Sequence, residues 1–513
     1  MNDKKRKKRR GNYDQDIEIF DLVDYSEEEE QPKRRKSAHR KHVKPKPKKQ
    51  MRNKEFARVT YFFVALFLFM VGYIVYFQVV RSKDIINNPY NQRQNSFAER
   101  IVRGKILDRD GNVLAQTNIT EEGKETREYP YGNIYAHVIG YTTRGNTGLE
   151  SVNNFELLTS NAFVLERMMK ELQDEKNIGD NIITTLDTRV QKAAYDALGN
   201  NRGAVIAIEP STGKILACVS KPDFNPNTIE NDWEVLNDSE SSVLLNRATQ
   251  GKYAPGSTFK MVSTLAYMRT NSNFPTYSFE CTGSFEYEGT TIHCINGKAH
   301  GTVNLEGSVA YSCNSSFSNM GLQSGVEKIK DVSGELLFDK KLPSPLQASN
   351  SQLGLTKDSN SANVMMTSIG QGELQVSPYH MALIASAIAN QGTLMKPYLV
   401  SEVQNYTGST VSKHTPTSYG DLMTMEEASW LGDYMKAVVQ YGTGTSLNGR
   451  SYSVAGKTGT AEVSMDKITT HSWFMGYRNV ENPDMAICVI VENSNESDAR
   501  SINIAGKVFD AYN

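Results

Sequence analysis

One apolar run, residues 59–80 (VTYFFVALFLFMVGYIVYFQVV), contains no charged side chain. At about 1.5 Å of rise per residue, a helix over this run would be about 33 Å long, enough to cross the roughly 30 Å hydrocarbon core of a bilayer. A buried core helix of this length would normally show a polar face, and this run has none. A cleaved signal peptide is disfavoured, because no small-x-small cleavage site follows the run. The pattern therefore predicts a membrane-spanning helix over residues 59–80.

Downstream of this run, short apolar stretches predict strands that are joined by tight turns. Residues 103–108 alternate, an Asp-Gly turn follows, and the pattern resumes at residues 113–115, which predicts a hairpin. Residues 203–209 and 214–220 are apolar on both sides of a Pro-Ser-Thr-Gly turn, which is typical of two strands in a buried sheet. The other predicted elements are strands at residues 181–186, 472–477 and 485–492, and helices at residues 161–175, 188–198 and 503–512.

The order of these elements predicts an α+β fold whose main sheet joins strands from distant parts of the chain. The hairpin that begins at residue 203 and the apolar runs after residue 457 would belong to this one sheet. We expect four parts along the chain. They are a disordered charged tail (residues 1–58), the spanning helix (59–80), a small α+β pedestal domain (81–186) and a main domain (187–513).

Charge is divided unevenly along the chain, although the formal net charge is only −1. Residues 1–58 contain 20 Lys and Arg against 11 Asp and Glu, whereas the other residues contain 37 against 47. A nucleic-acid-binding protein would carry its basic surface on the folded part, so this distribution argues against that class. By the positive-inside rule, the basic flank predicts a cytoplasmic N-terminus and an extracytoplasmic main domain. We interpret the tail as a solvated arm that touches anionic lipid; a docking arm for a cytoplasmic partner or nucleic acid is the alternative.

Ser257 and Lys260 carry the first candidate chemistry. They follow the chain-breaking pair Pro255-Gly256 and precede an apolar stretch, so Ser257 should begin a helix with Lys260 one turn later. A lysine that is desolvated at the start of a buried helix can be neutral and accept the hydroxyl proton. The helix N-terminus stabilises the negative charge that develops. The Ser-x-x-Lys pattern alone is weak evidence, because it occurs three times in the chain.

Two further patterns follow in order. Ser312-Cys313-Asn314 lies 55 residues after Ser257, and Lys457-Thr458-Gly459 stands just before the predicted C-terminal strands. A phosphate-binding loop at the second pattern is excluded, because Ser451 occupies the position that would require glycine. Ser-x-x-Lys, Ser-x-Asn and Lys-Thr-Gly in this order are the motif set of serine acyl transferases such as penicillin-binding proteins and serine β-lactamases.

With these motifs the chain resembles the class B penicillin-binding proteins over roughly residues 97–513. Residues 103–115 (RGKILDRDGNVLA) and 127–141 (REYPYGNIYAHVIGY) resemble the pedestal signature of that family, and residues 203–227 resemble the first sheet of its transpeptidase domain. Gly370-Gln371-Gly372 and HSWFMGY (471–477) match as well. The resemblance implies a penicillin-binding/serine β-lactamase-like transpeptidase fold on a small α+β pedestal. It also implies a membrane-anchored D,D-transpeptidase that cross-links peptidoglycan stem peptides through an acyl-serine, which β-lactams acylate as well.

The resemblance assigns catalytic roles to the matching positions. Ser257 is expected to be the acylated nucleophile and Lys260 its general base. Ser312 is expected to relay the proton to the leaving amine, held by Lys260 and Lys457. The backbone N–H groups of Ser257 and Thr460 are expected to form the oxyanion hole, where one donor is worth roughly 10²–10³ in rate.

The resemblance assigns substrate-binding roles to the remaining motif positions. Asn314 is expected to hydrogen-bond the substrate amide. Lys457 and Thr458, with Gly459 beside them, are expected to bind the terminal carboxylate of a D-Ala-D-Ala stem. Because the chain after the tail is net acidic, a local cation is needed to hold that carboxylate, and Lys457 supplies it.

The number of residues between the span and the main domain indicates which branch of the family the chain resembles. Residues 81–186 are too few for the glycosyltransferase domain of a class A protein, and a secreted β-lactamase would need neither anchor nor pedestal. The resemblance therefore implies a small class B transpeptidase in the bacterial cell membrane, working beside a SEDS-type glycan polymerase that contacts the span and pedestal. A non-catalytic scaffold and a β-lactam sensor are the alternatives. Intact motifs argue against the scaffold, and the lack of a transmitting cytoplasmic domain argues against the sensor.

Five cysteines in 513 residues exclude a disulfide-stapled scaffold. We interpret Cys313 as a small packing residue. Cys281 and Cys294 lie in a Gly-rich insert near His300 and leave three alternatives open. These are a structural zinc ion bound by Cys281, Cys294, His300 and a fourth ligand from elsewhere, a disulfide, or free thiols. The acyl chemistry itself requires no cofactor.

Overall fold

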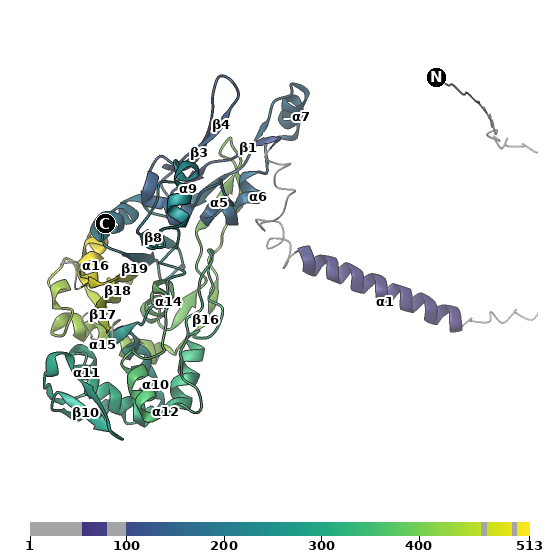
Figure 1. Cartoon of the computed structure of the whole chain (residues 1–513). Coiled ribbons are helices and arrows are strands. Elements are labelled where there is room, and N and C mark those ends of the chain that lie inside the picture. The colour runs from purple at the N-terminus through teal and green to yellow at the C-terminus, as the bar shows by residue number, and fades with distance from the viewer. Residues whose placement is uncertain (1–53, 79–98, 463–468, 495–499, 513) are drawn as a thin grey trace, which may run out of the picture. The chain divides into compact units, whose positions relative to one another are not determined.

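The computed structural model describes residues 54–78, 99–462, 469–494 and 500–512 (Figure 1). Helix α1 (Lys54–Tyr76) contains the segment Phe56–Tyr76, which is long and apolar enough to cross a membrane and has a mean hydropathy of 2.2. The described side chains of this segment are exposed in the absence of lipid, as expected for a membrane-spanning helix. The predicted tail up to residue 53 and the end of the predicted span, residues 79–80, lie outside the described residues.

A five-stranded antiparallel sheet forms the centre of the main domain, with strand order β17-β18-β19-β7-β8. Its two inner neighbours, β19 and β7, come from opposite ends of the domain, so the predicted sheet that joins distant parts of the chain is confirmed. Apart from β17, which carries the Lys-Thr-Gly motif, the strands are rich in apolar residues, because helices cover both faces of the sheet. Their bounds are β7 Gly203–Ile208, β8 Ile215–Lys221, β17 Val454–Glu462, β18 Thr470–Arg478 and β19 Met485–Val491.

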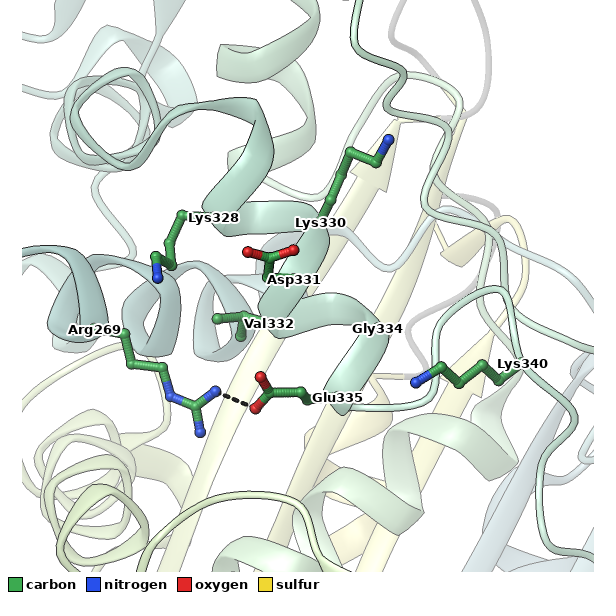
Figure 2. Close-up of a pocket in the computed structure, with 8 residues that line it drawn as sticks. All are labelled: Arg269, Lys328, Lys330, Asp331, Val332, Gly334, Glu335 and Lys340. Carbon is green, nitrogen blue, oxygen red and sulfur yellow. Dashed lines mark hydrogen bonds and ion pairs between the residues drawn. The ribbon is translucent and has the colours of Figure 1, made fainter.

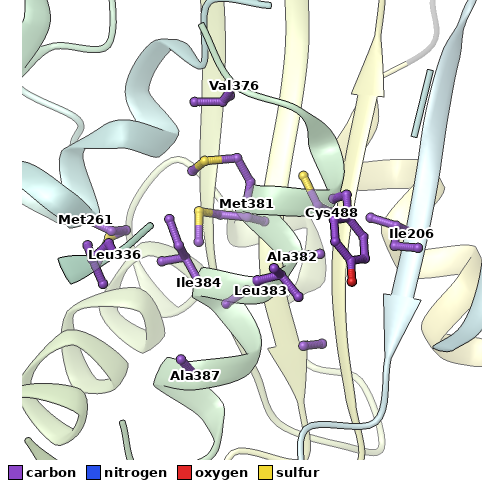
Figure 3. Close-up of a cluster of buried hydrophobic side chains, with 14 of the residues drawn as sticks. Ile206, Met261, Leu336, Val376, Met381, Ala382, Leu383, Ile384, Ala387 and Cys488 are labelled. Atoms are coloured by element: carbon purple, nitrogen blue, oxygen red, sulfur yellow. The ribbon is translucent and has the colours of Figure 1, made fainter. Parts of the chain in front are cut away.

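The two faces of this sheet are buried by different helices. Helix α14 (Pro378–Ala389) is buried on every side and packs its apolar residues against Ile206 of β7 and Cys488 of β19 (Figure 3). Alternate strand residues face the other way and pack against α8 (Thr188–Leu198) and α16 (Ser501–Asp510). A helix that is apolar all round belongs in a core, which is where α14 lies.

A second sheet of six strands supports the main domain, with strand order β15-β14-β6-β2-β3-β4. The predicted hairpin at residues 103–115 is present as the antiparallel pair of β2 and β3. Strands β14 and β15 come from residues 400–413, far along the chain from the predicted pedestal segment 81–186. The bounds are β2 Ile106–Leu107, β3 Val113–Ile119, β4 Glu125–Glu128, β6 Asn181–Thr184, β14 Val400–Gln404 and β15 Thr410–Lys413.

The helix predicted at residues 161–175 is shorter in the structure, where α7 covers Val164–Leu172. A parallel pair of short strands, β1 (Ile101–Val102) and β5 (Asn177–Ile178), brings the end of this helical segment beside the start of the pedestal. The other elements outside the site are α4 Ala136–Ile139, α5 Gly148–Val152, α6 Asn154–Leu157, α9 Ile229–Asn237, α13 Ser361–Ser368, β13 Thr393–Met395 and β16 Ser418–Asp421.

Candidate active site

Ser257 lies in a short 3₁₀ turn, η3 (Gly256–Phe259), that continues directly into α10 (Lys260–Thr270). The turn is pressed against two other segments. A Cβ atom at Gly256 would lie 2.4 Å from the carbonyl oxygen of Thr460, and one at Gly370 would lie 1.8 Å from the carbonyl oxygen of Gly256. Both glycines also have positive φ angles, so side chains there would be strained as well as crowded. The two glycines thereby let Ser257 approach the strand that carries Thr460.

Lys260 connects the first motif to the second. Its Nζ donates to the carbonyl oxygen of Ser312 at 2.8 Å, to the Oγ of Ser312 at 3.2 Å and to the Oδ1 of Asn314 at 2.6 Å. Ser312 adopts a left-handed φ of 57° between α11 (Leu305–Ala310) and α12 (Asn314–Glu335). Non-glycine residues in this conformation are uncommon and concentrate at functional sites. In the described part of the chain, no hydrogen bond joins Ser257 Oγ to Lys260 Nζ, and catalytic contacts of this kind often tighten only with substrate.

Burial changes the protonation of both motif lysines. Lys260 is completely buried, and desolvation lowers its pKa to about 7. Lys457 is also completely buried, and its pKa is lowered well below the usual lysine value by desolvation first and by the charge of Lys260 second. A lysine whose pKa is near neutrality can act as a base at physiological pH, whereas a solvent-exposed lysine cannot.

Strand β17 presents the third motif at the edge of the five-stranded sheet. Thr458 is half-buried, and its Oγ1 lies 2.6 Å from the Oγ1 of Thr443. Lys457 Nζ donates to the carbonyl oxygen of Thr458 at 3.0 Å. The expected contact of Lys457 with Ser312 is not among the hydrogen bonds of the described residues. Thr460 is exposed and follows Gly459, whose neighbours include the carbonyl oxygen of Pro255 just before Ser257.

A partly buried carboxylate that the sequence analysis missed supports the turn before Ser257. Glu492 accepts hydrogen bonds from Arg247 Nε at 2.8 Å, from Tyr253 Oη at 2.7 Å and from Arg202 Nε at 3.0 Å. The ring of Tyr253 packs edge-on against Trp473 of β18. These contacts fasten the segment that leads to Ser257 onto the central sheet. No motif marks Glu492, because its partners are 239 and more residues away in sequence.

Beside the second motif, three cysteines and a histidine form a compact cluster. The Sγ atoms of Cys281 and Cys294 are 3.7 Å apart, those of Cys294 and Cys313 are 3.8 Å apart, and Cys281 Sγ is 3.4 Å from His300 Nδ1. All four potential ligand atoms lie within 4.8 Å of one another. The interpretation of Cys313 as a packing residue is therefore incomplete, because it is buried but also faces the cluster. The sequence already places Cys313 in the same part of the chain as Cys281, Cys294 and His300, which indicates that it could join their cluster.

A charged pocket elsewhere on the main domain contains none of these residues (Figure 2). It is lined by the C-terminal half of α12 and by Arg269, which forms ion pairs with Glu335 and Glu427. Its lining carries four cationic side chains against two carboxylates and none of the motif residues, whereas the predicted catalytic residues gather between α10, α12 and β17.

Comparison with known proteins agrees with this geometry. Residues 203–512 match a family model described as the penicillin-binding protein transpeptidase domain, and residues 103–182 match one described as the penicillin-binding protein A dimerisation domain. The chain is 32% identical to the peptidoglycan D,D-transpeptidase PbpA of Mycolicibacterium smegmatis, over 86% of this chain and 94% of that protein. It is 27% identical to the stage V sporulation protein D of Bacillus subtilis, over 76% of this chain and 62% of that protein.

A solved structure of penicillin-binding protein A from M. tuberculosis, a ceftriaxone acyl-enzyme complex, resembles the fold closely. Its TM-score is 0.75 at 29% sequence identity, and the match covers 81% of this chain and 99% of that one. The predicted family and the predicted α+β transpeptidase fold are thereby confirmed.

Proposed function

The chain belongs to the penicillin-binding protein transpeptidases, and from this premise we propose that it is a peptidoglycan D,D-transpeptidase in which Ser257 carries the acyl group. The observation that supports this assignment is the convergence of the motifs. Buried Lys260 bonds both Ser312 and Asn314, and the turn that holds Ser257 packs against the strand that holds Thr460.

In the acylation step, neutral Lys260 takes the hydroxyl proton of Ser257, and the oxygen attacks the carbonyl of the penultimate D-Ala. The backbone N–H groups of Ser257 and Thr460 stabilise the oxyanion. The C–N bond then breaks, and Ser312 relays the proton from Lys260 to the amine of the departing D-Ala, which leaves Lys260 neutral again. An amine of a second stem peptide attacks the acyl-serine and gives its proton to neutral Lys260; the C–O bond to Ser257 breaks, Lys260 returns the proton to the Ser257 oxygen, and the new amide is the cross-link.

Substrate recognition falls to Asn314, Lys457, Thr458 and Gly459. Asn314 is held between Lys260 and the carbonyl oxygen of His293, which accepts from its Nδ2 at 2.9 Å. This arrangement fixes the amide side chain that bonds the stem peptide. Thr458, with its hydroxyl beside Thr443, receives the terminal carboxylate. The arriving negative charge raises the lowered pKa of Lys457, which then takes up a proton and supplies the positive charge.

Intact-mass measurement with a fluorescent penicillin tests the assignment. Full-length protein in detergent should gain one adduct, and Ser257→Ala should gain none while melting at the same temperature. Ser211→Ala is a matched control, because Ser211 belongs to another Ser-x-x-Lys pattern in a hairpin turn and its loss should leave the adduct unchanged. Folded wild-type protein that forms no adduct would favour a non-catalytic scaffold instead.

We also propose that Cys281, Cys294, Cys313 and His300 hold a structural zinc ion. A tetrahedral zinc site with Zn–S bonds of about 2.3 Å and Zn–N bonds of about 2.0 Å places sulfurs about 3.8 Å apart and S and N about 3.5 Å apart. The observed separations of 3.7, 3.8 and 3.4 Å fit this geometry, and 3.7 Å is far too long for a disulfide between Cys281 and Cys294. The donor set is of the Cys₃His type that structural zinc sites use.

Native mass spectrometry tests the zinc site. Protein loaded with zinc should retain one ion per chain, and Cys281→Ser should lose it. Cys218→Ser is the control, because Cys218 is equally buried but lies in β8, outside the cluster. Retention of no zinc by the wild-type protein, or equal retention by both variants, would contradict the assignment.

We further propose a single-pass topology with a cytoplasmic N-terminus, and a SEDS-type glycan polymerase as partner of the span and pedestal. Support for the partner comes from α7 and the residue before it, which expose large apolar side chains on the pedestal: Phe163, Val164, Leu165, Met168, Met169 and Leu172. Exposed apolar patches of this kind mark interaction surfaces. Leu172→Glu should abolish co-purification of the polymerase and leave penicillin acylation unchanged; undiminished co-purification would remove α7 from the contact.

A further inference from the structure

A groove of about 510 Å³ lies beside the second and third motifs. It is bordered by β12 (Gly301–Val303), by α11 and by the residues that follow α15 (Met425–Gln440). We call it the tyrosine groove, because three of the residues that line it are tyrosines. Its lining includes Tyr277, Ser278, Thr302, Asn304, Tyr311 and Tyr441.

Both rims of the tyrosine groove continue into the candidate active site. On one rim, Tyr311 immediately precedes Ser312, whose side chain is turned to Lys260. On the other rim, Tyr441 lies two residues before Thr443, which bonds the hydroxyl of Thr458. The rims are tied together by the backbone hydrogen bond from Thr443 to the carbonyl oxygen of Ala310 at 3.0 Å. A ligand in the groove would therefore lie next to the segments that hold Ser312 and Thr458, where the reacting stem peptide is proposed to bind.

The tyrosine rings are held in place before any ligand arrives. Tyr311 is 40% exposed, stacks on His300 with an interplanar angle of 12°, and meets the edge of Tyr441 at 5.8 Å between ring centroids. Tyr441 is 42% exposed and donates its hydroxyl proton to Glu306. Tyr277 is anchored by a 2.9 Å hydrogen bond between its hydroxyl and that of Ser316. Rings fixed in this way lose little conformational entropy on binding.

The lining is aromatic and polar but carries no formal charge. Ser278, Thr302 and Asn304 add hydroxyl and amide groups, and no Lys, Arg, Asp or Glu belongs to the described lining. Glu306, the nearby carboxylate, already accepts the Tyr441 hydroxyl. A stem peptide brings carboxylates that would find no cation here, whereas a saccharide offers apolar C–H faces to aromatic rings and hydroxyls to polar side chains.

We propose that the tyrosine groove binds a neutral N-acetylated saccharide unit of the glycan strand whose stem peptide enters the active site. This inference rests on the proposed transpeptidase function and extends it to the substrate's sugar. Stacking on Tyr311 and Tyr441 would hold the glycan while the stem reaches Ser257. The enzyme would then prefer a stem peptide that still carries its saccharide over the same peptide without it.

The test compares two donors on the full-length protein in detergent: a disaccharide-pentapeptide and the free pentapeptide. The readout is kcat/KM for D-Ala release. Wild type should prefer the disaccharide donor, and Tyr311→Ala or Tyr441→Ala should each lower that preference about tenfold, a stacking contribution of ordinary size. Tyr311→Phe keeps the ring and should keep the preference. Tyr419→Ala is the matched control, since Tyr419 is 45% exposed on β16, away from the groove. It should leave kcat/KM unchanged for both donors.

Each other result overturns the inference in a recognisable way. A wild-type enzyme that turns over both donors equally contains no saccharide site. Equal losses for both donors in Tyr311→Ala and Tyr441→Ala would assign the rings to the stem peptide or to the stability of the site. A wild-type protein that releases D-Ala from neither donor and forms no penicillin adduct would overturn the proposed function, and the saccharide site with it.

Discussion

The protonation of one side chain, Lys260, controls the proposed reaction. Desolvation lowers its pKa to about 7, and its Nζ already has oxygen partners on Ser312 and Asn314. Only the neutral amine can accept the Ser257 proton, so the reactive fraction rises with pH until it levels off above the pKa. Acylation by penicillin should therefore fall about tenfold for each pH unit below 7 and be flat between pH 8 and 9.

Stopped-flow acylation rates between pH 5 and 9 measure this profile. Lys260→Arg is the informative variant, because a guanidinium stays protonated over the whole range and should leave the protein unacylated at each pH. Thermal melting of both proteins at each pH separates loss of the base from loss of the fold. A wild-type rate that stays constant down to pH 5 would show that another group takes the proton.

The sequence predicts the candidate catalytic residues but not the side chains that pack around them. Ser257, Lys260, Ser312, Asn314 and Lys457 stand in three ordered motifs, so their identities could be read from local spacing, and their roles stay predictions. Glu492 could not be found in this way, since its three partners come from two distant segments, one with Arg202 and one with Arg247 and Tyr253, that only the folded sheet brings together. Cys313 is buried, as expected of a packing residue, but its closeness to Cys294 arises from the fold and could not be read from spacing along the chain.

Among the elements, the pedestal depends on a buried charge cluster. Glu150 of α5 is fully buried and pairs with Arg103 Nε at 2.6 Å and with Arg127 Nε at 2.8 Å. Burial acts to raise the pKa of Glu150, but the two arginines outweigh it and hold that pKa below its usual value. A carboxyl whose folded pKa is depressed adds stability above its unfolded pKa, and that stability is lost as pH falls through the folded value.

Glu150→Gln should therefore destabilise the pedestal, because it leaves two arginines facing each other without a counter-charge. Breaking a buried ion pair from one side typically costs about 3–5 kcal/mol. Urea denaturation at pH 7 should show this loss, whereas Glu122→Gln, at an exposed turn, should change stability by less than about 0.5 kcal/mol. The difference in unfolding free energy between wild type and Glu150→Gln should become smaller as the pH falls below the carboxyl pKa of the unfolded chain. A difference that does not change with pH would instead indicate that the substitution disturbs packing.

The elements themselves were predictable to different degrees. Strands β7, β8, β18 and β19 were found because both-face burial produces continuous apolar runs. Strand β14 was not predicted, since only Val403 of its five residues is buried and its pairing with β6 reaches across more than 200 residues. Local patterns report the burial of a strand but not its partner, so the contribution of residues 400–413 to the pedestal sheet was invisible in the sequence.

On the scale of the whole molecule, the membrane topology determines the redox conditions to which the cysteine cluster is exposed. The basic flank before α1 predicts that the domain with the active site lies outside the cytoplasm. Outside, thiols as close as those of Cys281 and Cys294 are exposed to an oxidising compartment, where disulfides form and persist. Zinc bound to the thiolates would keep them in the separated geometry that the structure shows.

Reporter fusions at Asn513 test this arrangement in cells. Alkaline phosphatase, which needs an oxidising compartment, should be active there, and a cytoplasmic-type green fluorescent reporter should stay dark. Replacing the Lys and Arg residues between positions 41 and 58 with Gln should lower the phosphatase signal, because the positive-inside bias is removed. The same number of replacements within the first ten residues, farther from α1, is the control and should have little effect. A fluorescent, phosphatase-negative wild-type fusion would reverse the topology and place the active site away from its substrate.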